Sequence, residues 1–256
     1  MKIYQSICKR INLKPSGLLI SMISALFLFV STFEIFAQQT KDGAPKLTAI
    51  NTSIIWGNVD GVDIEGMVQG PATEKTTLQV ACVFEYTEGD IFKSPPALPA
   101  EVNGMLHLDN ALNGLITDLR KSGKFAGHVF ETLLITPPHG SIGAKKLLLI
   151  GLGDRNKFSP ELMIGIGSVA MHEALRLGVT SYAFASDLKD AGIDSPTALV
   201  AGNVVKGSFY AYRTMAYLKT KEMAVYKPIK KITLLAGPAF FEVAGQGIKD
   251  AIIEIK

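Results

Sequence analysis

The stretch Lys145-Lys-Leu-Leu-Leu-Ile-Gly-Leu-Gly153 decides the fold class. Its two lysines are followed by a wholly apolar run, which is typical of a strand buried on both faces of a parallel sheet. The two glycines allow the chain to leave this strand in a tight turn. Ser159-Pro160 then places a capping residue before a proline, and this pair predicts the start of an amphipathic helix that ends near Arg176.

The same alternation continues towards the end of the chain. We expect a strand over 179–185, a helix from Ser195-Pro196 to about Leu218, a strand over 230–236 and a last helix over 240–255. An order of β-α-β-α-β-α predicts parallel strands joined by crossover helices, which is an α/β sandwich.

The pattern before residue 145 is less regular. We expect strands over 47–56, 76–84 and 128–136, and a helix over 100–121 with leucines at helical spacing. Residues 57–71 carry four glycines, too many for a helix, and predict turns or a hairpin.

Charge is unevenly placed along the 256 residues. Residues 1–37 hold four of the 26 Lys and Arg residues and one of the 23 Asp and Glu residues, so the remaining chain has 22 of each sign and is formally neutral. With 48% hydrophobic and 19% charged residues, the composition excludes a disordered chain, a collagen-like repeat and a coiled coil. It gives no support to a nucleic-acid partner, which favours a basic domain.

Residues 1–37 resemble a secretory signal peptide. A basic start is followed by an apolar run from Leu18, and Ala37 supplies a small residue at the cleavage position. We therefore expect an exported protein, periplasmic or extracellular, with a flexible leader over 38–46, a folded domain over 47–256 and no stable membrane insertion after cleavage. The alternative is an uncleaved membrane anchor, because the apolar run is about long enough to span a bilayer.

Removal of residues 1–37 leaves Cys82 as the one cysteine, so no internal disulfide is expected. Cys82 lies in an apolar, strand-like run. We expect a buried, unreactive thiol, since no histidine or cationic residue is near it in sequence.

No catalytic motif is evident in the remaining residues. Gly151-Leu-Gly153 fits only the first two glycines of a dinucleotide fingerprint, and the four histidines form no zinc-binding spacing. We therefore assign no catalytic, cofactor-binding or metal-binding residue. Two groups of charged residues are expected to be solvated: the loop aspartates Asp187, Asp190 and Asp194, and the basic residues Arg155, Lys157 and Arg213.

Five segments in order resemble the N-terminal domain of the leucyl aminopeptidases of peptidase family M17. They are Leu108-Asp-Asn-Ala-Leu-Asn-Gly-Leu-Ile-Thr-Asp-Leu-Arg-Lys-Ser-Gly-Lys-Phe-Ala-Gly127, Glu131-Thr-Leu-Leu-Ile135, Lys146-Leu-Leu-Leu-Ile-Gly-Leu-Gly-Asp154, the helix end Ala174-Leu-Arg176, and Ala198-Leu-Val-Ala-Gly-Asn-Val-Val-Lys-Gly-Ser-Phe-Tyr-Ala-Tyr212. The resemblance extends over roughly residues 47–256. It implies a macro-domain-like, three-layer α/β/α sandwich with a mixed sheet and crossover helices.

The resemblance also implies that this sequence lacks the metal ligands of the family. The metal ligands of the family lie in its C-terminal catalytic domain, in motifs such as N-T-D-A-E-G-R, and this sequence contains no such motif. The first functional hypothesis is a non-catalytic exported domain that binds a protein partner, a second copy of itself or a small ligand. The alternatives are the non-catalytic part of a split or truncated metal-dependent aminopeptidase, and a binder of ADP-ribose-like nucleotides.

Overall fold

The computed structural model describes residues 47–90 and 98–256, and places the domain within residues 47–256. The signal peptide and the leader expected over 1–37 and 38–46 lie outside the described residues. The seven described strands are β1 (Ser53–Val59), β2 (Val62–Val68), β3 (Leu78–Val83), β4 (Thr132–Ile135), β5 (Lys146–Gly151), β6 (Ser181–Ala185) and β7 (Lys231–Ala236). The five described α-helices are α3 (Gly104–Ala111), α4 (Leu115–Lys121), α5 (Leu162–Arg176), α6 (Thr197–Thr220) and α7 (Phe241–Ile255).

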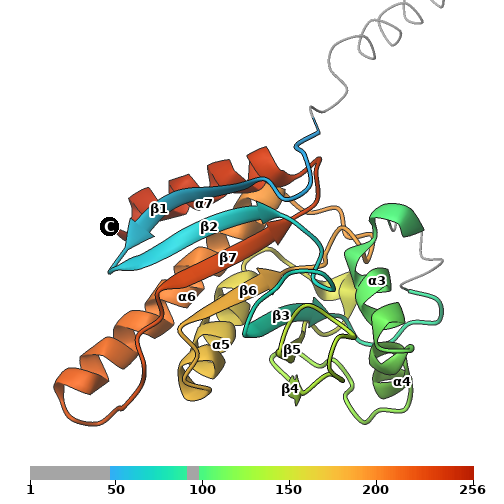
Figure 1. Cartoon of the computed structure of the whole chain (residues 1–256), viewed down its shortest axis with the longest axis horizontal. Helices are drawn as coiled ribbons and strands as arrows, with labels where there is room; N and C mark the ends of the chain where they lie inside the picture. The colour runs from blue at the N-terminus through green and yellow to red at the C-terminus, as the bar shows by residue number, and fades with distance from the viewer. Residues whose placement is uncertain (1–46, 91–97) are drawn as a thin grey trace, which may run out of the picture. The chain divides into compact units, whose positions relative to one another are not determined.

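The strands form one mixed sheet in the order β1-β2-β7-β6-β3-β5-β4 (Figure 1). The five inner strands are parallel to one another, and β1 and β4 pair antiparallel at the two edges. From β5 onward the order is strand, helix, strand, helix, strand, helix, as the sequence predicts. The expected α/β fold with a mixed sheet and crossover helices is therefore confirmed.

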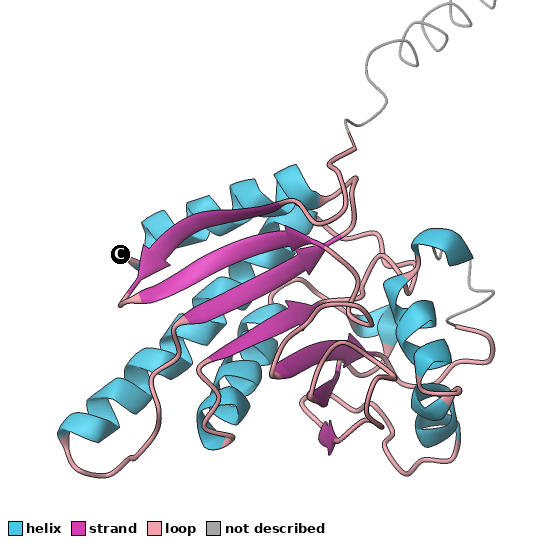
Figure 2. Cartoon of the chain, viewed as in Figure 1, coloured by secondary structure: helices cyan, strands magenta, loops and turns pink. Residues whose placement is uncertain are grey.

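Helices cover both faces of the sheet (Figure 2). On one face α5, α6 and α7 pack over a large apolar cluster that includes Ile64, Tyr182 and Ile232. On the other face α3 and α4 pack over a smaller cluster around Leu147 and Leu149. Successive side chains of β5 lie alternately in the two clusters, because neighbouring side chains of a strand point to opposite faces of the sheet. This arrangement is a three-layer sandwich.

The contact between α5 and α6 depends on glycine. A Cβ atom at Gly207 would lie 1.8 Å from the carbonyl oxygen of Ile164, and one at Gly167 would lie 2.3 Å from that of Val204. The hydroxyl of Ser168 donates to the carbonyl oxygen of Gly207 at 2.9 Å. The two helices therefore approach backbone to backbone, which leaves no room for side chains at the crossing.

The single helix expected over 100–121 is wrong. Asn113 and Gly114 have φ angles of 55° and 80°, so the chain turns between α3 and α4. The buried carboxylate of Asp109 stabilises the break by accepting the backbone N–H of Ile116 at 2.8 Å and the hydroxyl of Thr117 at 2.6 Å. Asp109, which lies on α3, thus caps the start of the next helix, α4.

Two expected helix starts also differ. Ser159-Pro160 forms a preceding turn, with the N–H of Leu162 bonded to the carbonyl oxygen of Ser159, and α5 begins at Leu162. Pro196, and not Ser195, is the capping residue of α6. In the glycine-rich segment, the hairpin alternative is correct: β1 and β2 form it, and β2 enters the sheet beside β7.

Candidate functional site

A cavity of about 370 Å³ lies at the carboxyl ends of β2, β6 and β7, beside the N-termini of α6 and α7. Parallel strands end at a common edge, and open α/β sheets bind their ligands in the crevice outside that edge. Most of the lining is apolar. The principal apolar side chains are those of Trp56, Phe184, Val200, Val204, Leu234, Phe240, Phe241 and Ile248.

Trp56 fits a slot made by two glycines. A Cβ atom at Gly66 would lie 2.3 Å from the indole Nε1, and one at Gly245 would lie 2.3 Å from Cζ2. The ring centroid lies 5.4 Å from that of Phe241, and the Lys249 ammonium lies 4.5 Å over the indole. The buried Nε1 has no hydrogen-bond partner among the described residues. Trp56, which lines the cavity, therefore carries a buried indole N–H that no described residue satisfies.

The loop after β6 contributes two carboxyl groups to this cavity. Asp187 Oδ2 accepts the backbone N–H of Cys82 at 3.2 Å, and Asp190 Oδ2 accepts that of Met105 at 3.2 Å. The expectation that the three aspartates are solvated is wrong for these two and holds for Asp194, which is exposed and ion-paired with Lys189. The carboxyl groups turn inward because each satisfies a backbone donor of a neighbouring element.

The pKa values of both half-buried aspartates are raised. Burial is the main cause for Asp187, and the adjacent charge of Asp190 adds to it. Burial also raises the pKa of Asp190, while the N–H groups of Met105 and Gly104 oppose the increase. The carboxyl groups of Asp187 and Asp190 lie close enough to affect each other's pKa. Two carboxylate charges so close together repel each other, which raises the pKa of the pair further.

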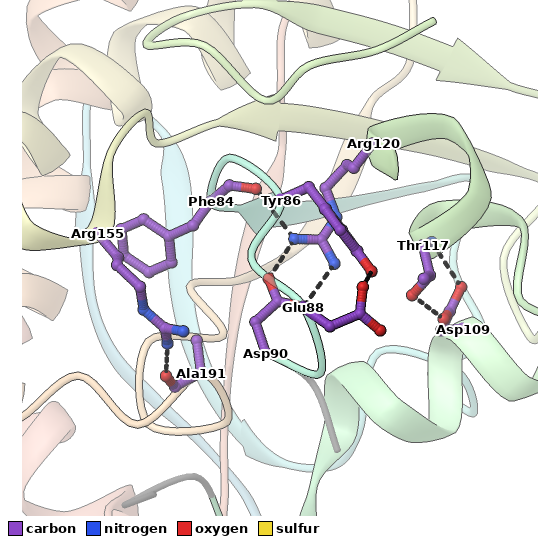
Figure 3. A network of polar contacts seen from close by, with 9 residues as sticks. All are labelled: Phe84, Tyr86, Glu88, Asp90, Asp109, Thr117, Arg120, Arg155 and Ala191. Carbon is purple, nitrogen blue, oxygen red and sulfur yellow. Dashed lines mark hydrogen bonds and ion pairs between the residues drawn. The ribbon is translucent and has the colours of Figure 1, made fainter. Parts of the chain in front are cut away.

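A second buried polar group lies where β3 leads into the loop before α3 (Figure 3). The Arg120 guanidinium donates to both carboxylate oxygens of Asp90, at 2.6 and 3.2 Å, and to the carbonyl oxygen of Phe84 at 3.1 Å. The exposed fractions of the two side chains are 2% and 7%. Nearer the surface, the hydroxyl of Tyr86 donates to Glu88 at 2.6 Å. A cavity of about 20 Å³ is lined by Arg120 and Asp90 and also by Asp187 and Asp190, so the two buried polar pairs are neighbours.

The basic residues singled out in the sequence are not brought together. Arg155 donates to the carbonyl oxygen of Ala191, and Lys157 pairs with Asp154 at 3.6 Å. Arg213 pairs with Asp60 at 2.7 Å on another part of the domain. The three side chains therefore do not form one anion site.

The glycines of the Gly151-Leu-Gly153 turn have a structural role. A Cβ atom at Gly151 would lie 2.0 Å from the carbonyl oxygen of His128, and Gly153 has a φ angle of 77°. The N–H of Gly153 donates to the carbonyl oxygen of Gly127 at 2.8 Å. These contacts and the positive φ angle require glycine at both positions, so the two glycines need no nucleotide site to explain them.

Cys82 is buried, as the sequence predicts, with 1% of its surface exposed. Burial raises the pKa of its thiol, and the charge of Asp187 raises it further. Within residues 47–90 and 98–256, no three His, Cys, Asp or Glu side chains are grouped so that they could hold a metal ion. None of the described helices combines the length and the apolar character that a membrane span requires.

Sequence reasoning did not identify this cavity. Its aromatic lining comes from Trp56 on β1, Phe184 on β6 and Phe241 on α7, which are far apart along the chain. One signal was available: Asp187 and Asp190 directly follow a predicted parallel strand, and residues at that position face the ligand edge of such sheets. The lone tryptophan beside a glycine-rich segment was a second, weaker signal.

Comparison with protein families identifies one match in this region. The model of the cytosol aminopeptidase family, N-terminal domain, matches residues 91–215. A probable cytosol aminopeptidase of Roseiflexus castenholzii is 28% identical over 141 residues, which are 55% of this chain and 28% of that protein. One of Burkholderia orbicola is 26% identical over 151 residues, which are 57% of this chain and 29% of that protein. The matched region thus spans less than a third of these relatives.

Solved structures with a similar fold include a mutant of tomato leucine aminopeptidase and a macrodomain of Oceanobacillus iheyensis with MES bound. The first has 20% identity and a TM-score of 0.48, and the match covers 77% of this chain and 37% of that one. The second has 12% identity and a TM-score of 0.48, and covers 79% of this chain and 98% of that one.

The family match names the N-terminal domain of the cytosol aminopeptidases, and the curated relatives are probable cytosol aminopeptidases. Both findings agree with the resemblance noted in the sequence. The chain is therefore related to the N-terminal domain of the cytosol aminopeptidase family, peptidase family M17.

Proposed function

We propose that this domain is a non-catalytic binding module whose ligand occupies the cavity at the carboxyl edge of the sheet. The observation that carries the proposal is the cavity itself, with its apolar, aromatic lining at the ligand edge of a parallel sheet. Its volume lies within the range of roughly 300–1,000 Å³ that small-molecule sites occupy.

The lining favours an uncharged, largely apolar ligand that carries a hydrogen-bond acceptor. Phe184, Phe241 and Val200 provide apolar contacts, and the indole N–H of Trp56 is a donor without a described partner. A buried donor without a partner costs roughly 1–3 kcal/mol, so an acceptor that reaches Nε1 is favoured. Asp190, which also lines the cavity, would select against an anionic group placed next to it.

The relatives support the non-catalytic part of the proposal. The matched family region is an N-terminal domain, and the resemblance assigns the metal ligands of the family to its other domain. The test is an assay of leucine anilide hydrolysis by the chain purified from Gln38 onward, with manganese, zinc or cobalt. We expect no turnover above background, and turnover that depends on metal and is proportional to protein would contradict the proposal.

Binding in the cavity can be tested with an uncharged, apolar fluorescent probe, N-phenyl-1-naphthylamine. We expect the native protein to enhance its fluorescence and Ala201→Phe to abolish the enhancement, because Ala201 lines the cavity and a phenyl ring would fill it. Leu199→Phe is the matched control, since Leu199 lies on the same helix and is 41% exposed. Equal fluorescence in all three proteins would place the probe elsewhere and reject the site.

A second candidate function is a subunit of a split aminopeptidase, and the identity of the curated relatives favours it. In that case the domain would bind a separately encoded catalytic chain. A neighbouring reading frame that encodes only the catalytic domain of the family would support this function, and co-purification of the two chains would test it.

The basic and apolar start of the sequence supports a further proposal, that the protein acts outside the cytoplasm. N-terminal sequencing of material from the periplasm or medium is expected to begin near Gln38. Exported material that begins at Met1 would contradict signal cleavage.

A further inference from the structure

The end of α6 and its connection to β7 form a tip at the edge of the sheet opposite the cavity. The tip comprises residues 219–230. Helix α6 begins beside the cavity, at Thr197, and runs 24 residues to Thr220. In Figure 1 its last turns and the following loop extend beyond the amino end of β7. The tip is therefore separate from the cavity and independent of the proposed function.

Apolar side chains of the tip point into solvent. Val225 is 98% exposed and Met223 is 76% exposed, and Tyr217 on the adjacent turn of α6 is 62% exposed. Single exposed apolar residues are normal on protein surfaces. Here two residues alternate with the half-buried Ala224 and Tyr226 along one segment. The alternation means that one side of the segment packs on the domain and the other displays its apolar side chains.

Contacts on the inner side of this segment fix its orientation on the domain. The ring of Tyr226 meets that of Tyr212 edge to face, with centroids 6.2 Å apart, and the Lys219 ammonium lies 4.9 Å over the Tyr226 ring. Ile229 is 1% exposed and anchors the end of the segment in the large apolar cluster. The outward direction of Met223 and Val225 is thus fixed by packing.

Basic residues surround the two apolar side chains. The tip carries Lys219, Lys221, Lys227 and Lys230, all exposed, against the single acidic residue Glu222. The sequence from residue 38 onward is formally neutral, so this positive charge is local. Apolar side chains framed by lysines match the chemistry of a bilayer surface, where acyl chains lie beneath anionic headgroups.

We propose that the tip binds the surface of an anionic lipid bilayer. Met223 and Val225 insert at the boundary between headgroups and acyl chains, and the lysines contact the headgroup phosphates. The match in charge is the reason to choose a lipid surface over a second copy of the chain, whose own tip would repel it.

The test is sedimentation with vesicles, using the chain from Gln38 onward so that the apolar N-terminal run does not contribute. The two apolar clusters of the described residues run from Val59 to Ile255, and this protein contains all of them. We expect binding to vesicles of phosphatidylcholine with about one third phosphatidylglycerol, and little binding to phosphatidylcholine alone. Binding should weaken between low and physiological salt, as exposed charges are screened.

Paired variants separate the two contributions. The double variant Lys227→Ala, Lys230→Ala should lower the partition coefficient about 25-fold. Each lysine near an anionic membrane contributes about fivefold, and the two factors multiply. Met223→Ser with Val225→Ser should lower it at least about tenfold, because two apolar side chains leave the membrane. The matched controls are Ile253→Ser, at a residue also 76% exposed but on α7, and Lys157→Ala, at an exposed lysine in the turn after β5.

Unchanged melting temperatures will show that the variants fold. Equal binding to both vesicle types, no binding to either, or equal losses in the controls would each overturn the proposal. Sedimentation without vesicles that the tip variants abolish would also overturn it and identify self-association instead.

Discussion

The carboxylate of Asp187 accepts the backbone N–H of Cys82 at 3.2 Å, and the carboxyl group of Asp190 lies beside it. This pair joins three elements, because Asp190 in turn accepts the N–H of Met105 at the start of α3. The loop after β6 is thereby fixed to β3 and to α3. Asp187 and Asp190 are therefore structural groups of the cavity wall, and replacing both would change the domain as well as any chemistry.

Asp187→Asn is expected to preserve the fold at neutral pH. The amide oxygen can accept the N–H of Cys82 and the amide nitrogen can donate to Asp190, as a protonated carboxyl does. Asp187→Ala should lower the free energy of unfolding by roughly 1–3 kcal/mol, because the buried N–H of Cys82 loses its acceptor. Denaturant unfolding of the two variants measures this difference. Equal losses in both would mean that Asp187 has no specific hydrogen-bonding role.

The stability of the native protein relative to Asp187→Asn should depend on pH. The pKa of Asp187 is raised in the folded state, so the folded protein binds more protons than the unfolded chain above the ordinary aspartate pKa of about 3.9. Stability contributed by this group is then present at low pH and is lost as the pH rises towards the raised pKa. We expect the unfolding free energy of the variant minus that of the native protein to increase from pH 4 to pH 8. A constant difference would exclude a raised pKa at Asp187.

The sequence predicts the second half of this fold well because its signals are local. The apolar run before Ile150 and the proline-marked turns are consecutive in the chain, and they give the order of β5, α5, β6, α6, β7 and α7. The break between α3 and α4 is harder to predict. The break depends on Asp109, whose side chain caps the helix that begins six residues later. In the sequence, Asp109 cannot be told from any other polar residue of an amphipathic helix.

The site is hardest to predict because it depends on contacts between distant residues. Arg120 pairs with Asp90 across 30 positions, and Cys82 meets Asp187 across 105. In sequence, the loop aspartates look like solvated charges. Asp187 and Asp190 instead turn inward because backbone donors of other elements bind them, and no local pattern carries that information.

Arg120→Met, in the buried ion pair on α4, should destabilise the domain strongly. It keeps an apolar stem but leaves the buried Asp90 carboxylate without its partner, and breaking a buried pair costs roughly 3–5 kcal/mol. Adding Asp90→Asn should recover part of this loss, because the uncompensated charge is removed. The measurement is a double-mutant cycle of unfolding free energies, with Lys121→Met as the control at the neighbouring exposed lysine. Additive effects of the two changes would show that the pair is not coupled.

Gly207→Ala tests the backbone contact between α5 and α6. The added methyl would lie 1.8 Å from the carbonyl oxygen of Ile164, so the helices must separate or the backbone must shift. Overpacking of this kind typically costs roughly 1–3 kcal/mol, against a gain from the better helix propensity of alanine of about 1 kcal/mol. Because the obstructing atom belongs to a helix backbone and cannot rotate away, we expect the cost to exceed the gain and the melting temperature to fall. Gly70→Ala is the control, since its nearest neighbour would be 3.9 Å from the new methyl, and it should leave the melting temperature unchanged or slightly raised. A Gly207→Ala protein as stable as this control would mean that α5 and α6 are further apart than the structure places them.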